Sequence, residues 1–188
     1  MKKPTILMDI NLLNWMAGLP YSSEPKSFDL NKERLAFQEL LKLRENGRIE
    51  INLIDWQLKR FVESKIKLPD KLKEVLNHFE NKISLKHFLV FQDSDLDKIY
   101  DELMDYLWDG QEKQDDLELF VVSHYADASI THVVTCDAKI RAKYQSFLNK
   151  LKKNAKLRKE VEFKKRKVRV CSGLPSEVLE DLRAKGVT

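Results

Sequence analysis

The sequence predicts an α/β domain with a central parallel β-sheet flanked by helices. Short apolar runs alternate along the chain with segments of helical periodicity, which is the pattern of βαβ units. Two of these runs, at 5–8 and 132–136, are almost continuously apolar, as strands buried on both faces are. With 188 residues, 43% of them hydrophobic, the chain is long enough to form one domain around its own core. We therefore expect residues 1–188 to be a single domain.

Local signals set the boundaries of the predicted elements. The helix at 31–45 is expected to stop at Asn46-Gly47, and Asp55 is placed to cap the helix that follows the second strand. Ser94 is placed to begin another helix, whereas 18–29 is rich in Gly, Pro and Ser and is expected to be a loop. In chain order the predicted strands span 5–8, 49–54, 85–91, 132–136 and 168–172, and the predicted helices span 31–45, 56–66, 70–79, 96–108, 116–128, 138–159 and 176–185.

Charge is distributed unevenly along the chain. The formal net charge is +4, yet residues 150–169 hold eleven Lys and Arg against two acids, so this basic segment carries +9 and the rest carries −5. No apolar run approaches the roughly 18 residues of a membrane span, and the first residues do not form a signal peptide. Two cysteines without CxxC spacing argue against a disulfide framework or a structural zinc site. We expect a cytoplasmic protein that does not bind membranes.

Acidic residues follow the predicted strands at the places where the strands end. Asp9 follows the first strand and Asp137 follows the run at 132–136, while Asp115 and Asp116 open a predicted helix. An acid at such a position is commonly a cap or a turn residue. However, parallel strands end at one edge of a sheet, and carboxylates that meet there require a compensating cation. Oxygen ligands select Mg²⁺ or Mn²⁺, whose bound water can attack a phosphodiester.

Three motifs resemble the PIN domain, a family of metal-dependent ribonucleases. They are LMDINLL at 7–13, DDLELFVVSHYA at 115–126 and VVTCD at 133–137, and they occur in the family's order. The resemblance implies a PIN-like fold with an enlarged helical region at 59–114. It also implies that Asp9, Asp116 and Asp137 bind Mg²⁺ or Mn²⁺, that Asp115 competes with Asp116 for this role, and that Asn11 and Thr135 support the ligands through hydrogen bonds.

The sequence departs from the family pattern at its second acid, usually a Glu in the helix after the second strand. Gln57 stands at the corresponding place and cannot neutralise a cation as a carboxylate does. Asp55 is the better substitute, because it lies at the end of the strand, although it can equally be a cap. Glu63 is two helical turns further on and is expected to be solvated. This departure leaves activity open.

The basic segment indicates a polyanionic partner, and the resemblance favours RNA, with DNA as the alternative. The alternative interpretation of the basic segment is an ordinary solvated helix. A second copy of the chain and an inhibitory protein are further candidate partners. The tryptophans Trp15, Trp56 and Trp108 are expected in the core, with base stacking as the alternative. The residues expected to bind the substrate backbone are Lys152, Lys153, Lys156, Arg158, Lys164 and Arg166.

The predicted function is that of a metal-dependent endoribonuclease, in which Asp9, Asp116, Asp137 and Asp55 are the candidate catalytic residues. The alternative is a catalytically degenerate PIN-like module that binds RNA or a protein, and Gln57 motivates it. A phosphatase of the haloacid dehalogenase type is a poorer reading of Asp9-x-Asn11, because that chemistry expects a second Asp where Asn11 stands.

Overall fold

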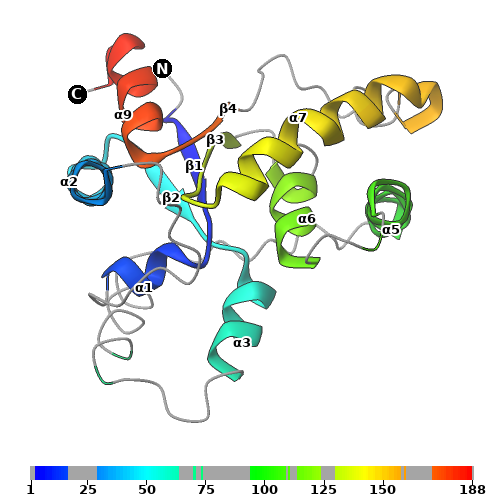
Figure 1. Ribbon diagram of the computed structural model, residues 1–188, viewed down its shortest axis with the longest axis horizontal. Helices are drawn as coiled ribbons and strands as arrows, with labels where there is room; N and C mark the ends of the chain where they lie inside the picture. The colour runs from blue at the N-terminus through cyan, green and yellow to red at the C-terminus, as the bar shows by residue number, and fades with distance from the viewer. Residues whose placement is uncertain are drawn as a thin grey trace.

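The protein is an α/β protein built on a four-stranded sheet in which all strands are parallel (Figure 1). The computed structural model describes residues 3–16, 29–63, 70, 73, 94–108, 110, 114–123, 130–157, 159 and 171–187. The strand order is β2-β1-β3-β4. The prediction of a parallel sheet is therefore confirmed. The strands are β1 (Thr5–Met8), β2 (Glu50–Asn52), β3 (Ile130–Val134) and β4 (Cys171–Gly173).

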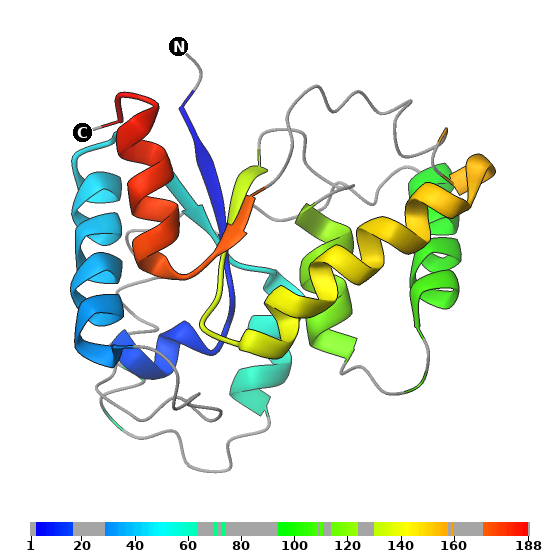
Figure 2. The ribbon, with the colours of Figure 1, turned by 45° about the horizontal axis from the view of Figure 1, so that its top comes forward.

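Helices cover both faces of the sheet, as Figure 2 shows. Helices α1, α2 and α9 pack on one face, and helices α5, α6 and α7 pack on the other. The described helices are α1 (Leu12–Met16), α2 (Leu30–Glu45), α3 (Asp55–Glu63), α5 (Ser94–Leu107), α6 (Gln114–Val121), α7 (Ala138–Lys153) and α9 (Pro175–Ala184).

The central strand β1 supplies side chains to two separate apolar cores. Successive strand residues point to opposite faces, so Ile6 and Met8 pack with α1, α2 and α9 while Leu7 packs with α5, α6 and α7. All four residues of β1 are buried. Because a strand covered on both faces has no solvated side, its sequence is an apolar run rather than an alternation. This burial is why the signal at 5–8 was readable from the sequence.

A buried carboxylate joins α2 to the start of α9. Glu33 of α2 accepts hydrogen bonds from the backbone nitrogen of Ser176, at 2.9 Å, and from its hydroxyl, at 2.7 Å. The first backbone N–H groups of a helix have no partner within the helix, so Glu33 acts as a cap supplied by another element. A cap within α9 itself comes from Glu177, whose side chain accepts from the Leu174 nitrogen at 2.7 Å.

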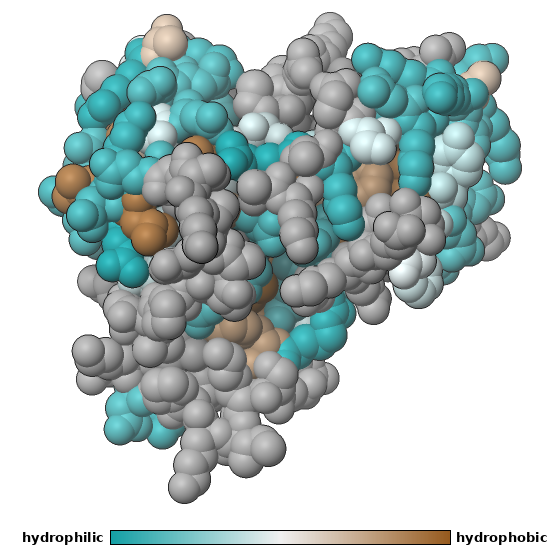
Figure 3. Space-filling model, viewed as in Figure 1, coloured by the Kyte–Doolittle hydropathy of each residue, from teal (hydrophilic) through white to brown (hydrophobic). Residues whose placement is uncertain are grey.

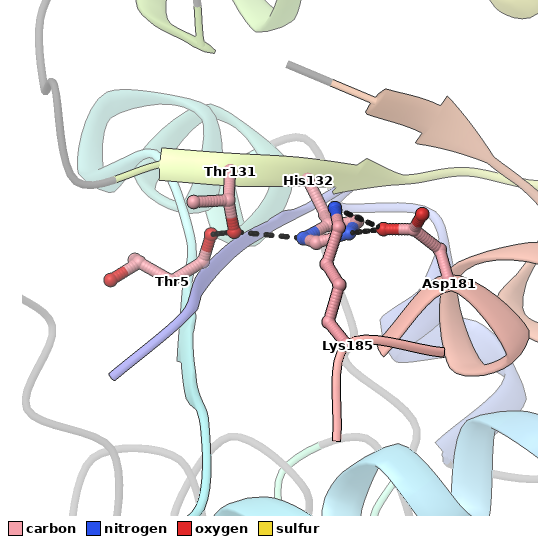
Figure 4. A network of polar contacts seen from close by, with 5 residues as sticks. All are labelled: Thr5, Thr131, His132, Asp181 and Lys185. Carbon is pink, nitrogen blue, oxygen red and sulfur yellow. Dashed lines mark hydrogen bonds and ion pairs between the residues drawn. The ribbon is translucent and has the colours of Figure 1, made fainter. Parts of the chain in front are cut away.

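A polar network fixes α9 against β3 (Figure 4). The ring of His132 is buried, with Nε2 2.6 Å from Asp181 Oδ2 and Nδ1 2.8 Å from the hydroxyl oxygen of Thr131. Lys185 donates to the same Asp181 oxygen. Burial lowers the pKa of His132, against the hydrogen bond with Asp181, while the bond from Lys185 is the main cause of a lowered pKa at Asp181. The network lies near the amino ends of the strands.

Several predicted boundaries differ from the observed ones. The second strand is shorter than 49–54, and the predicted helix at 138–159 ends at Lys153. Asn154 causes this break, because its side-chain oxygen accepts from the Leu157 nitrogen at 3.1 Å and starts a new turn. The predicted strand at 85–91, and most of the loop at 18–29 and the helix at 70–79, lie outside the described residues. No described helix is both long and apolar enough to traverse a bilayer.

Candidate functional site

The carboxyl ends of β1 and β3 place two of the predicted aspartates at the same edge of the sheet. Met8 pairs with Val134 in the sheet, and the backbone nitrogen of Asp9 donates to the Val134 carbonyl oxygen at 3.0 Å. Asp137 follows β3 after two residues and precedes α7, which leaves from this edge of the sheet (Figure 2). The rule that parallel strands bring their terminal residues to one edge therefore holds for Asp9 and Asp137.

Thr135 is the direct link between these two aspartates. Its hydroxyl donates to Asp9 Oδ2 at 2.6 Å and accepts from the backbone nitrogen of Asp137 at 3.1 Å. Thr135 is fully buried, and its own backbone nitrogen donates to the Gly173 carbonyl oxygen in β4. The sheet thus fixes the position of the Thr135 hydroxyl, which connects the Asp9 carboxylate to the Asp137 backbone through two hydrogen bonds.

The carboxylate of Asp9 is buried, and three protein donors stabilise its charge. Only 3% of Asp9 is exposed. Besides Thr135, the backbone nitrogen of Asn11 donates to Oδ1 at 3.0 Å, and the Asn11 side-chain nitrogen donates to the same oxygen at 3.2 Å. Hydrogen bonds of this kind favour the ionised carboxylate. Asn11 and Thr135 therefore make the hydrogen bonds that the sequence predicted for them.

Asp137 also caps the helix that follows it. Its Oδ1 accepts from the backbone nitrogen of Ile140 at 3.3 Å. Capping by the carboxylate and service as a ligand are compatible, because an ionised carboxyl group has about four acceptor positions. Asp137 is half-buried, whereas Asp9 is almost completely buried.

A further buried carboxylate, which was not predicted from the sequence, belongs to Glu118 of α6. Glu118 is 1% exposed, and its Oε2 accepts from Gln57 Nε2 at 3.2 Å and pairs with Arg60 Nη2. Both partners come from α3, the helix that follows β2. Gln57, at the position where the PIN pattern has a Glu, therefore faces a carboxylate across α3 and α6. The chain neighbours of Glu118, residues 117 and 119–121, are all apolar and buried. The sequence therefore indicates that an acid at 118 is buried and needs a partner for its charge.

The other predicted site residues are placed less completely. Asp116 is half-buried in the first turn of α6, and Asp55 begins α3. The side chains of Asp55, Asp115 and Glu63 lie outside the description. Within the described part of the chain, no three His, Cys, Asp or Glu side chains form a group that could hold one metal ion. The structure thus links Asp9 to Asp137 through Thr135, and Asp116 does not form a metal-holding group with them among the described residues.

Cys136 lies between Thr135 and Asp137 in the chain, but its side chain is buried in the core. Burial is the main cause of the raised pKa of its thiol, and the negative charges of Glu33 and Asp9 add to the shift. A thiol that stays protonated is neither a nucleophile nor a metal ligand. Cys136 is therefore a packing residue beside the Asp9 carboxylate.

The described lysines of the predicted substrate-binding set are exposed. Lys152 and Lys153 lie at the end of α7, and Lys156, also exposed, approaches Glu102 of α5 at 3.5 Å. The remaining members, Arg158, Lys164 and Arg166, lie outside the described residues. On the face seen in Figure 3, hydrophilic residues dominate the coloured surface over α7 and α5.

The expectation of buried tryptophans holds for only part of the set. Trp15 is buried in the core that contains α1, α2 and α9, and Trp56 is half-buried against the core on the other face of the sheet. Trp108, however, is 57% exposed, so the prediction for Trp108 was wrong. Trp108 follows the last residue of α5, where its backbone nitrogen still donates to Met104, and no described element packs over its side chain enough to bury it.

Comparison with protein-family models, with curated proteins and with solved structures gave no match to this chain. The fold and the site define an α/β protein in which Thr135 links the Asp9 carboxylate to the Asp137 backbone at the carboxyl edge of a parallel sheet. Its resemblance to PIN domains stays a prediction from the sequence motifs.

Proposed function

We propose that the protein is a metal-dependent endoribonuclease of the PIN type, with Mg²⁺ or Mn²⁺ held at Asp9 and Asp137. The observation that carries this proposal is the Asp9–Thr135–Asp137 arrangement at the carboxyl edge of the sheet. Folds of this class bind their ligands at that edge. Two carboxylates in one place repel each other unless a cation or a proton compensates them.

The donor set suits a magnesium-like ion. Mg²⁺ is usually bound by one or two carboxylates and keeps several waters, so a pair of aspartates is sufficient and a third ligand is not required. The Thr135 hydroxyl and the Asn11 amide would orient the Asp9 carboxylate, as hydrogen-bond partners behind metal ligands do. When bound, the ion would activate a water for attack on phosphorus and stabilise the charge that develops on the phosphate oxygens.

The basic residues supply what the acidic edge lacks. A carboxylate site repels the phosphate backbone, and Lys152, Lys153 and Lys156 are exposed cations on α7 and the turn after it, the elements that follow Asp137. Contacts from such lysines give affinity that falls with salt. In this proposal α7 carries both a metal ligand at its start and substrate contacts at its end.

Cleavage of a labelled single-stranded RNA in the presence of Mn²⁺ tests the proposal. Asp9→Asn and Asp137→Asn keep the size of the side chain and one acceptor oxygen, and we expect each to reduce cleavage to the uncatalysed background while circular dichroism shows a native fold. Asp101→Asn, which alters an exposed aspartate on α5, is the matched control and should cleave like the wild type. Full cleavage by Asp9→Asn or Asp137→Asn rejects the proposal.

The second candidate function is a PIN-like module that binds RNA or a protein without cleaving it. The Glu118–Arg60 pair favours this reading, because a cation near Gln57 would have to compete with a guanidinium already neutralising the buried carboxylate. Calorimetric titration with Mn²⁺ separates the two functions. The nuclease predicts binding heat that Asp137→Asn removes, whereas the binding module predicts no such heat in either protein.

A further inference from the structure

Two large aromatic side chains are exposed together at the end of α5. Tyr106 is 40% exposed and Trp108 is 57% exposed, and among the described residues the only other large hydrophobic side chain with comparable exposure is Leu35 of α2. Side chains two positions apart within a helix do not face each other, but Trp108 lies just beyond the last residue of α5, so both rings are exposed at the same end of this helix. Both side chains of this aromatic pair therefore offer ring surface to solvent.

Hydrogen bonds attach the aromatic pair to the first lysine of the basic segment. The Tyr106 hydroxyl donates to the Lys150 carbonyl oxygen at 3.3 Å, and Lys150 Nζ donates to the Leu107 carbonyl oxygen at 3.0 Å. That carbonyl belongs to the peptide bond that continues into Trp108. The Lys150 ammonium group therefore lies beside the backbone of Trp108, and the junction between α5 and α7 is fixed from both sides.

Exposed cations continue from this junction, and acids limit its other side. Lys152 and Lys153 follow Lys150 on the basic segment and are exposed, as is Lys156, which approaches Glu102 of α5 at 3.5 Å. Asp101 and Asp105 are exposed on α5, where Asp105 precedes Trp108 by about one helical turn. A phosphate backbone would be attracted to the α7 side of the aromatic pair and repelled from the Asp105 side.

We propose that Tyr106 and Trp108 form a stacking platform for the bases of single-stranded RNA, with lysines of the basic segment contacting its phosphates. The inference rests on the proposed ribonuclease function and specifies its substrate as single-stranded. Exposed aromatic rings beside a basic track are the usual means of binding single strands, because unpaired bases offer a free face. In a duplex the bases are already stacked on one another, so they offer no free face to the two aromatic rings and the platform does not contribute to binding.

Binding of a fluorescent oligo-uridine RNA, measured by anisotropy in EDTA, tests the platform without any cleavage. We expect Trp108→Ala to weaken binding by about tenfold, which is the ordinary contribution of one stacked base. Trp108→Phe should restore most of the affinity, since it keeps an aromatic face. Leu35→Ala is the matched control, because it removes an exposed hydrophobic side chain from α2, and it should bind like the wild type.

Salt and strandedness distinguish stacking from charge. The loss in Trp108→Ala should persist at every salt concentration, whereas Lys153→Gln should lower the slope of log affinity against log salt by about 0.7 for a single strand. Trp108→Ala should leave binding to a duplex of the same length unchanged, and Asp105→Asn should strengthen binding to the single strand. Equal losses for duplex and single strand, or an equal loss in Leu35→Ala, would overturn the platform.

Failure of the platform and failure of the nuclease give different results. If the wild type binds and cleaves RNA but Trp108→Ala binds equally well, only the platform is refuted. If binding depends on Trp108 but no cleavage occurs with Mn²⁺, the platform stands and the nuclease is refuted. If the wild type binds no RNA, the platform is refuted, and the Mn²⁺ titration still decides the metal site.

Discussion

Thr135→Val is the perturbation that most directly probes how the site is held together. Valine has nearly the shape of threonine, but it removes the donor to Asp9 Oδ2 and the acceptor for the Asp137 nitrogen. A hydrogen bond to a charged group is worth about 1.5–3 kcal/mol, and a backbone N–H left without its partner adds about 1 kcal/mol. We therefore expect Thr135→Val to lower the free energy of unfolding by about 2.5–4 kcal/mol.

Urea denaturation followed by circular dichroism measures this change, with Thr135→Ser as the control. Serine keeps the hydroxyl and loses one buried methyl group, which costs about 1 kcal/mol. Thr135→Val leaves the buried Asp9 charge with one donor fewer, and a neutral amide at position 9 avoids that penalty. The loss of unfolding free energy caused by Asp9→Asn should therefore be about 1 kcal/mol smaller in Thr135→Val than in the wild type. If Thr135→Val is no less stable than Thr135→Ser, the hydroxyl does not hold the site as described.

Three further perturbations test other parts of the molecule. Arg60→Ala should destabilise the protein by about 2–3 kcal/mol, since the pair is buried only on the Glu118 side, and adding Glu118→Gln should recover part of this loss in urea unfolding. Because burial lowers the pKa of His132, the folded state binds fewer protons there than the unfolded state, so stability should fall as the pH drops below about 6.5, the usual histidine value. Asp181, whose pKa is lowered mainly by the hydrogen bond from Lys185, adds a loss of stability at more acidic pH. In melting curves recorded across this pH range, His132→Gln should remove the histidine part and reduce the Asp181 part, because His132 also lowers the Asp181 pKa. Cys136, in a variant without the other cysteine, should resist alkylation at neutral pH until urea unfolds the chain; rapid labelling of the folded protein would contradict its burial.

The parts of the fold that follow from local signals were predictable. The strand at 5–8 is recognisable because a strand buried on both faces is apolar throughout, and the stop of α2 is recognisable because Gly47 has a positive φ that favours glycine. The pairing of Asp9 with Asp137 follows from one further rule, that parallel strands end at the same edge. These predictions needed no knowledge of contacts between distant segments.

The remaining features depend on contacts that a single sequence does not specify. Glu118 is buried because Arg60 and Gln57 approach it from a helix about sixty residues earlier in the chain. The break in the predicted helix at 138–159 was not predicted, because the residues around Asn154 are compatible with a continuous helix. Only the hydrogen bond from the Leu157 nitrogen shows that Asn154 caps a new turn. The exposure of Trp108 likewise depends on what packs around the end of α5, which composition cannot reveal.

Crystals soaked in Mn²⁺ give the most direct test of the central claim, because anomalous scattering locates this ion independently of the protein. We predict one anomalous peak at the carboxyl edge of the sheet, coordinated by oxygens of both Asp9 and Asp137, and its disappearance in Asp137→Asn. A saturating soak that leaves this edge without a peak, or a peak bound by neither aspartate, would contradict the account.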